Sequence, residues 1–365
     1  MDAQDSKTKL AALAAHAAAE LRAKRRPGET TSVEKAFFKG SELARTTPHW
    51  GDAIMCDGLV RASRALEDDA PARTAIEWFK PRLAGGARIA DWFWFWAAEG
   101  LAAIDLYQYC GEAAYLEFAR GVVDALENRI AHAPDGAIMP HPPNVEVWVD
   151  VVYFSTPAMA RLGRLTGDKA MISRALTQLM LHAKHLRDHA SGLFWHVAYV
   201  DKRSHSACLW ARGNSWFSIA ATEVLGEVRA AKLETEMASQ VREVSETVAR
   251  QLASVIKLQD RSGLWHTVID RPDSYLEASA TAGFTLALGR ALKLNLPGLD
   301  LDATRQAHAA ALTAVCGKIN SEGDFTGVAE QTPPGDFAWY QSIPVGTAPF
   351  GTGICLIALA ESLSE

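Results

Sequence analysis

The sequence predicts an all-α protein, and two patterns favour an (α/α)6 barrel of about six helical hairpins. Apolar residues recur every three or four positions, as at Leu10, Leu13, Ala17 and Leu21, and no segment alternates as a half-buried strand would. Four loops share a Gly and a nearby apolar residue, and their glycines are Gly136, Gly192, Gly263 and Gly323. The spacings of 56, 71 and 60 residues each fit one helix pair with its loops, so 365 residues hold about six units. An open helical solenoid is the alternative.

The predicted helices follow one another along the chain, and Gly, Pro, Asp and Asn mark the breaks between them. The first is rich in Ala, the best helix former. The helices cover about residues 6–25, 51–66, 97–110, 112–131, 151–165, 168–188, 214–227, 229–257, 279–294, 301–318 and 350–364. No break is long or simple enough to be a linker, so we expect a single domain over residues 1–365.

The composition is that of a folded protein, with 48% hydrophobic and 22% charged residues. The net charge of -6 shows no excess of basic residues, so we expect neither nucleic acid nor a membrane surface as partner. The five cysteines are isolated, and the N-terminus lacks the order of a secretory signal. We therefore predict a cytoplasmic protein without disulfides. The sequence does not predict the oligomeric state.

The first candidate site is Val147-Trp148-Val149-Asp150, directly before an apolar helix. In an extended segment residues two apart point the same way, so Trp148 and Asp150 can face one cavity. An indole beside a carboxyl group excludes water and favours its protonated form, which suits a general acid. The alternative is that Asp150 only caps the following helix.

The second candidate is Trp210-Ala211-Arg212-Gly213-Asn214-Ser215-Trp216. We expect Asn214 to be an N-cap, which places Arg212 just ahead of a helix N-terminus, where anions are favoured. The guanidinium of Arg212 matches a carboxylate, and Trp210 and Trp216 can stack on a sugar or on Arg212. The alternative is an arginine stacked between core tryptophans.

Histidines end several of the repeated loops, namely His141, His196 and His266. They can face one open end of the barrel as hydrogen-bond donors or proton carriers, or each can be an ordinary loop histidine. Another group, Pro48-His49-Trp50-Gly51-Asp52, opens the second helix and can line the rim, although Asp52 and Ser279 can equally be N-caps. The spacing of His182, His185 and His189 fits a solvated helix end better than a metal site. We predict no metal and no organic cofactor.

These motifs, in this order, resemble the unsaturated rhamnogalacturonyl hydrolases of glycoside hydrolase family 105. The unsaturated glucuronyl hydrolases of family 88 are similar but less close. The resemblance implies an (α/α)6 barrel enzyme that removes a 4,5-unsaturated uronic acid from the non-reducing end of oligosaccharides made by polysaccharide lyases. It implies Asp150 as general acid and base with Trp148 beside it, and substrate binding by His196, Arg212, Trp210 and Trp216. His141 and His49 complete the expected substrate-binding set.

One position departs from that family. A second active-site Asp is usual on the preceding inner helix, and the matching residue here is Phe95. Asp91, one turn earlier, is the candidate second acid, and Glu99, one turn later, shares the same helix face.

Two other functions stay open at this point. A sugar isomerase or epimerase could use His196 and His266 as acid and base. A non-catalytic oligosaccharide-binding protein would use the tryptophans for stacking and Asp150 only as a cap.

Overall fold

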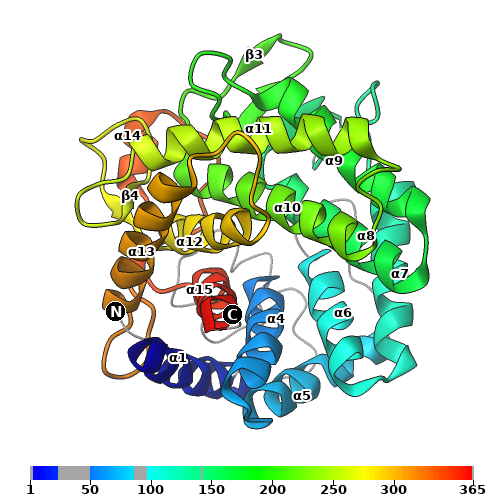
Figure 1. The fold of residues 1–365 in the computed structure, drawn as a ribbon, viewed down its shortest axis with the longest axis vertical. Coiled ribbons are helices and arrows are strands. Elements are labelled where there is room, and N and C mark those ends of the chain that lie inside the picture. The colour runs from blue at the N-terminus through cyan, green and yellow to red at the C-terminus, as the bar shows by residue number, and fades with distance from the viewer. Residues whose placement is uncertain (1–2, 24–49, 86–96, 141–142, 364–365) are drawn as a thin grey trace.

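The computed structural model describes residues 3–23, 50–85, 97–140 and 143–363. Within them, an inner ring of helices closes on itself, because each packs against the next and the last packs against the first (Figure 1). The inner helices are α4 (Trp50–Leu66), α6 (Ala98–Cys110), α8 (Val151–Thr166), α10 (Ala211–Ala230), α12 (Ala278–Lys293) and α15 (Pro349–Leu363).

A second set of helices packs on the outside of this ring. They are α1 (Ala3–Ala23), α5 (Ala70–Gly85), α7 (Ala113–Asn128), α9 (Lys169–Leu186), α11 (Ala238–Lys257) and α13 (Leu301–Gly317). Burial follows this division, since α10 and α15 are buried on nearly every face whereas α11 and α13 bury one stripe. The α/α-barrel prediction is confirmed, and the open solenoid is wrong because α15 meets α4.

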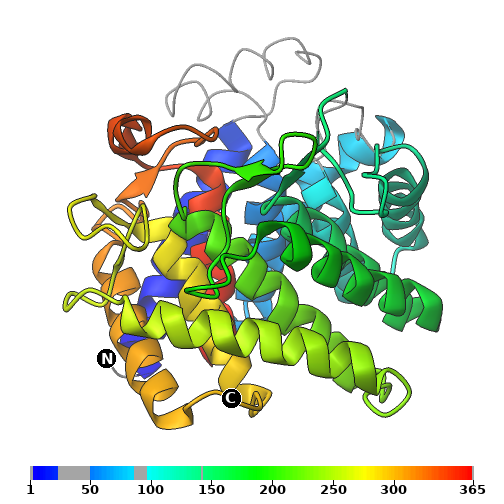
Figure 2. The same ribbon diagram turned by 90° about the horizontal axis from the view of Figure 1, so that it is seen from above.

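Short strands lie in the loops that lead into the inner helices (Figure 2). They are β1 (Glu146–Trp148), β2 (Val197–Tyr199), β3 (Ser204–His205), β4 (Trp265–His266), β5 (Leu276–Glu277), β6 (Val328–Ala329) and β7 (Val345–Gly346). All pairs are antiparallel, with β1-β2-β3 as one sheet and β4-β5 and β6-β7 as ribbons. Strands of two or three residues are too short to produce an alternating pattern, so the sequence did not predict them.

Two helices were also missed. The outer helix α5 contains Pro81, a residue that argues against a helix interior. The six-residue α14 (Phe337–Ser342) is shorter than any periodic signal. The predicted helix 229–257 is wrong at its start, because α10 runs to Ala230 and α11 begins only at Ala238.

The repeated glycines have a shared conformation. Gly136, Gly192, Gly263 and Gly323 all have positive φ, between 78° and 93°. A side chain is strained there, and a Cβ at Gly263 would lie 2.5 Å from the carbonyl oxygen of Ala310. The repeat therefore marks a turn that four of the hairpins use between the outer and the inner helix.

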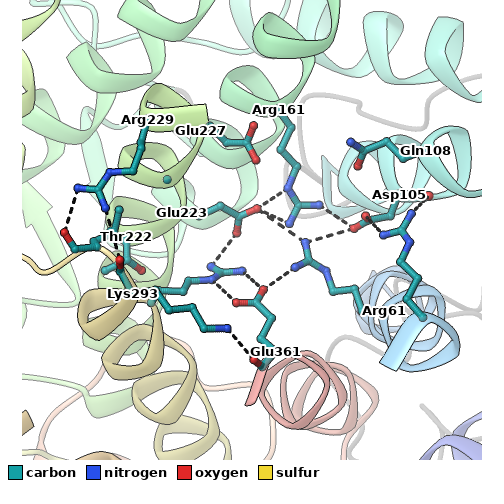
Figure 3. Close-up of a pocket in the computed structure, with 14 residues that line it drawn as sticks. Arg61, Asp105, Gln108, Arg161, Thr222, Glu223, Glu227, Arg229, Lys293 and Glu361 are labelled. Carbon is teal, nitrogen blue, oxygen red and sulfur yellow. Dashed lines mark hydrogen bonds and ion pairs between the residues drawn. The ribbon is translucent and has the colours of Figure 1, made fainter. Parts of the chain in front are cut away.

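The C-terminal end of the inner helices carries a closed ring of alternating charges (Figure 3). It contains one residue from each inner helix, in the order Arg61, Asp105, Arg161, Glu223, Arg290 and Glu361. Five of the six neighbouring pairs have nitrogen-to-oxygen distances between 2.5 and 3.2 Å, and the ion pair of Arg161 with Glu223 completes the circle. We call these six residues the charge ring.

The charge ring shows that the inner helices are parallel, since six residues near their C-terminal ends meet. A cavity of about 410 Å³ opens over it. Its further basic side chains are already engaged, because Arg64 pairs with Asp105 and Lys293 donates to the backbone oxygen of Glu361. The strand-bearing loops lie at the other end of the barrel (Figure 2).

Candidate active site

Asp150 lies between β1 and α8, at the strand-bearing end of the barrel. Its backbone is helical, with φ of -64° and ψ of -35°, and its side chain makes no capping hydrogen bond. The structure therefore gives no support to the alternative that Asp150 only caps α8. The amide of Val149 donates to the carbonyl oxygen of His196 at 3.0 Å, which fixes the Asp150 and His196 segments side by side.

The closest charged contact of Asp150 is with His196. Nε2 of His196 lies 3.3 Å from Oδ2 of Asp150, and the side chains are 1% and 14% exposed. The geometry is not that of a hydrogen bond, so Oδ2 is buried without a hydrogen-bond partner among the described residues. An unpartnered carboxyl oxygen beside a buried histidine is costly to maintain and is typical of a site that acts on a ligand.

Aromatic rings enclose this pair. The ring of Trp210 lies 4.3 Å from that of His196, and the ring of Trp148 meets it edge-on at 5.6 Å. The indole nitrogen of Trp148 donates to Glu146, which holds the ring in place. Trp148, Asp150, His196 and Trp210 are thus brought together, as the sequence motifs predict.

The structure adds Tyr340, which the sequence analysis missed. Its hydroxyl lies 2.6 Å from Nδ1 of His196, on the side of the imidazole opposite Asp150. Burial is the main reason why the pKa of Tyr340 is raised well above its ordinary value, so this side chain is a neutral phenol. No sequence signal could find it, because the contact joins residues 144 positions apart through the unpredicted α14.

Arg212 is the second residue of α10, and the prediction that it precedes the helix is wrong. It is buried over the rings of Trp210 and Phe350, at 4.6 and 4.7 Å. Burial lowers its pKa, and nearby Glu277 opposes that shift. Its terminal nitrogens donate to the backbone oxygens of Ala329 and Glu330 and to the side chains of Ser279 and Thr332. Arg212 therefore anchors residues 329–332 to the site, and direct contact with a uronate stays a prediction.

Asn214 is not the N-cap of α10, because that helix begins at Ala211. Its side-chain oxygen accepts from the amide of Phe194 at 2.8 Å, and its nitrogen donates to the carbonyl of Phe194 at 2.9 Å. This pair of bonds holds the loop that carries His196 against α10.

The N-cap of α12 is Glu277, whose side chain accepts from the amides of Ala280 and Ala329. The prediction of Ser279 as the cap is wrong, because Ser279 lies inside α12. Asp52 likewise lies within α4 and is buried, so it does not cap that helix.

Trp216 lies beneath the site. It is 2% exposed, and its ring stacks on Tyr153 at 4.5 Å and meets Phe154 at 5.9 Å. This places it in the aromatic floor of the barrel interior. His266 donates from Nδ1 to the backbone oxygen of Ser274, as an ordinary loop histidine does.

Four predicted positions, His49, Asp91, Phe95 and His141, lie outside the described residues. Glu99 is described, is fully buried, and forms an ion pair with Arg82 at 2.9 Å. Among the described residues, no cluster of three or more His, Cys, Asp or Glu could hold a metal ion. In the same parts of the chain, no helix has both the length and the hydrophobicity needed to cross a membrane.

The chain matches a known protein family over most of its length. The model of Glycosyl Hydrolase Family 88 matches residues 29–364. The unsaturated rhamnogalacturonyl hydrolase YesR of Bacillus subtilis is 25% identical over 345 residues, which cover 92% of this chain and 95% of YesR.

The fold of the chain is also similar to those of solved protein structures. A possible member of the GH105 family from Salmonella enterica serovar Paratyphi A superposes with a TM-score of 0.83 at 25% identity, covering 98% of this chain and 94% of that one. A possible member of the same family from Klebsiella pneumoniae gives a TM-score of 0.83 at 24% identity, with 98% and 93% covered.

Proposed function

The chain belongs to glycosyl hydrolase family 88, and on that premise we propose that it is an unsaturated uronyl hydrolase with Asp150 as general acid and base. Its substrates are oligosaccharides left by polysaccharide lyases, which carry a 4,5-unsaturated uronic acid at the non-reducing end. The relative YesR, named an unsaturated rhamnogalacturonyl hydrolase, supports a rhamnogalacturonyl-type substrate.

The reaction is the hydration of a vinyl ether. The O–H bond of the Asp150 carboxyl group breaks, and its proton goes to C4 as the C4–C5 double bond becomes single. Positive charge develops at C5 and is shared with the ring oxygen. A water oxygen then bonds to C5, and the proton released from that water returns to the Asp150 carboxylate. The C5–O5 bond of the resulting hemiketal then breaks, which leaves a ketone at C5 and a hemiacetal at C1. This hemiacetal collapses to an aldehyde as its C1–O bond to the remaining sugar breaks and its hydroxyl proton passes to the departing oxygen, so that the remaining sugar leaves as an alcohol. No oxidant, reductant or cofactor is needed for this balance.

One observation carries the assignment of Asp150. Its carboxyl group lies at the strand-bearing end beside His196 and Trp148, and one of its oxygens is buried without a hydrogen-bond partner among the residues of ranges 3–23, 50–85, 97–140 and 143–363. Vinyl-ether hydration needs a single carboxyl group that first gives and then takes a proton. This differs from ordinary glycoside hydrolysis, in which two carboxyl groups flank the anomeric carbon.

The surrounding residues have supporting roles in this proposal. Trp210 and Trp148 exclude water and offer faces for the sugar ring. His196 lies against the acid, and Arg212 holds the 329–332 segment that borders the site. His49 and His141 remain predicted substrate-binding residues, and Asp91 the predicted second acid.

We also propose a cytoplasmic location, where lyase products that enter the cell would meet the enzyme. All five cysteines are free thiols, as a reducing compartment would maintain them. Fractionation of the producing cell would test this.

The test mixes purified protein with lyase-digested pectin, glycosaminoglycan and ulvan separately and follows the ultraviolet absorbance of the conjugated uronate. We expect absorbance to fall with the pectin digest and to stay constant with Asp150→Asn. Asp168→Asn is the matched control, because Asp168 caps α9 at the opposite end and Asn caps equally well.

Retention of full activity by Asp150→Asn would overturn the role of Asp150. Constant absorbance in every digest would overturn the reaction itself. Turnover of a saturated sugar would then favour the isomerase, and tight binding without turnover would favour the binding protein.

A further inference from the structure

Tyr340, His196 and Asp150 form a continuous buried row. We propose that Tyr340 is a positioning residue that fixes the tautomer of His196, so that the imidazole proton lies on Nε2, the ring nitrogen beside Asp150. The catalytic consequence rests on the proposed function, whereas the tautomer itself does not.

Within the described parts of the chain, each ring nitrogen of His196 has one polar neighbour. The Tyr340 hydroxyl lies 2.6 Å from Nδ1 of His196, and Oδ2 of Asp150 lies 3.3 Å from Nε2. The other close neighbours of the imidazole are the rings of Trp210 and Trp148, which carry no titratable group. His196 and Tyr340 are 1% and 0% exposed, so water does not compete for these contacts.

The direction of the first hydrogen bond follows from the phenol. Burial, with the Asp150 carboxylate and other nearby groups, disfavours the phenolate of Tyr340, so its oxygen keeps its proton. Among the described residues the Tyr340 hydroxyl has no hydrogen-bond acceptor besides Nδ1 of His196, so a buried O–H that did not donate there would be left unsatisfied. The O–H therefore donates to Nδ1. In neutral imidazole one nitrogen accepts and the other bears the proton, so the proton is on Nε2.

This arrangement has a consequence for proton delivery. Because Nε2, which bears the proton in this proposal, lies beside Oδ2 of Asp150, the acidic proton belongs on Oδ1. As that proton passes to C4, the carboxyl group becomes a carboxylate, which accepts a hydrogen bond more strongly than the acid does. The Nε2 to Oδ2 contact of the free protein, which lies within 3.3 Å but lacks hydrogen-bond alignment, is therefore expected to become a hydrogen bond in the transition state. No proton moves along His196 or Tyr340, since Asp150 gives one proton and recovers one from water.

The test reads the tautomer directly. Nitrogen-15 NMR of protein labelled at histidine distinguishes protonated Nε2 from protonated Nδ1, and His196→Gln identifies the His196 signals. We expect wild-type His196 to carry a proton on Nε2 and none on Nδ1. A proton on Nδ1 in the wild type would overturn the proposal without any variant.

Tyr340→Phe then tests whether the Tyr340 hydroxyl determines the tautomer of His196. We expect its His196 to lose the uniform Nε2–H state, and kcat to fall roughly tenfold with KM nearly unchanged, which is the effect of one buried hydrogen bond. Tyr115→Phe is the matched control, because Tyr115 is fully buried and its hydroxyl has no hydrogen-bond partner among the described residues. An unchanged His196 tautomer in folded Tyr340→Phe would overturn the role of Tyr340.

Different results would overturn the proposed reaction and the proposed role of Tyr340. Wild-type protein that leaves every unsaturated digest unchanged overturns the reaction, whatever the tautomer. Active wild-type protein with protonated Nδ1 overturns only the role of Tyr340.

Discussion

The two ends of the barrel are built from the same inner helices but satisfy their polar groups differently. At the C-terminal end, the charge ring pairs every member with two neighbours (Figure 3). At the N-terminal end, Asp150 keeps a buried oxygen that has no hydrogen-bond partner in the part of the chain that the structure describes. In the function proposed above, one end is organised for stability and the other for binding and chemistry.

A regular spacing connects the two ends. On four inner helices a site-end residue lies eleven positions before its member of the charge ring, and these pairs are Asp150 and Arg161, Arg212 and Glu223, Ser279 and Arg290, and Phe350 and Glu361. Eleven residues are about three helical turns, or roughly 16 Å, so both members face the barrel interior. At that distance the effects of substitutions are expected to be independent.

The largest expected effect is on stability. Glu223→Ala leaves Arg161 and Arg290 buried without one of their partners, which is expected to cost about 3–5 kcal/mol of unfolding free energy. The protein that remains folded should keep its kcat within about twofold. Urea denaturation and initial rates measure the two quantities, and a large fall in kcat at unchanged stability would contradict the division between ends.

Asn214 is a residue at which one substitution is expected to lower both the unfolding free energy and kcat. Asn214→Ala removes both side-chain bonds to the backbone of Phe194 and is expected to cost about 2–3 kcal/mol. It should also lower kcat, because the same bonds hold the loop of His196. Asn128→Ala, on the exposed face of α7, is the control in the same denaturation and rate measurements. Unchanged kcat in Asn214→Ala would show that this anchor does not position His196.

Acid should weaken the charge ring. Burial opposes ionisation of Glu361, but Arg290 and Arg61 outweigh it and lower its pKa to about 2. A pKa lowered on folding contributes stability that is present above the ordinary value of 4.5 and is lost as pH falls toward 2. We expect about 2 kcal/mol to be lost from this group between neutral pH and pH near 3. Denaturation of Glu361→Gln should show a smaller pH dependence, and an equal one would refute the assignment.

The smallest effect concerns Asp57, which lies one turn inside the charge ring on α4. Burial raises its pKa to about 7, although Arg61 opposes the shift. An acid with a raised pKa loses stability as pH increases from its ordinary value near 3.8 through about 7. Asp57→Asn is therefore expected to stabilise the protein more at alkaline pH than near pH 4. Thermal melts at the two pH values test this, and equal shifts would contradict it.

The sequence predicted much of the barrel because its signals are local. The four repeated glycines adopt the same left-handed turn, and the apolar periodicity places most helices within a few residues. The errors also have local causes. Pro81 hides α5, and α14 is too short to be periodic.

The site could be predicted only in part. Trp148, Asp150, His196 and Trp210 lie in recognisable motifs and meet as expected. Tyr340 and Glu277 depend on contacts between distant segments, which no local pattern contains. The charge ring was missed because each member resembles a solvated helix end on its own. Its alternation is visible only once six helix ends are known to meet.

The most direct test compares two carboxyl-to-amide substitutions on neighbouring inner helices, Asp150→Asn and Glu223→Gln. For each, the unfolding free energy and the rate of absorbance loss on lyase-digested pectin are measured. We predict that Asp150→Asn reduces the rate by at least about a hundredfold while changing stability by less than about 1 kcal/mol. Glu223→Gln should do the reverse. An active Asp150→Asn protein, or an inactive but fully stable Glu223→Gln protein, would contradict the assignment of chemistry to one end and stability to the other.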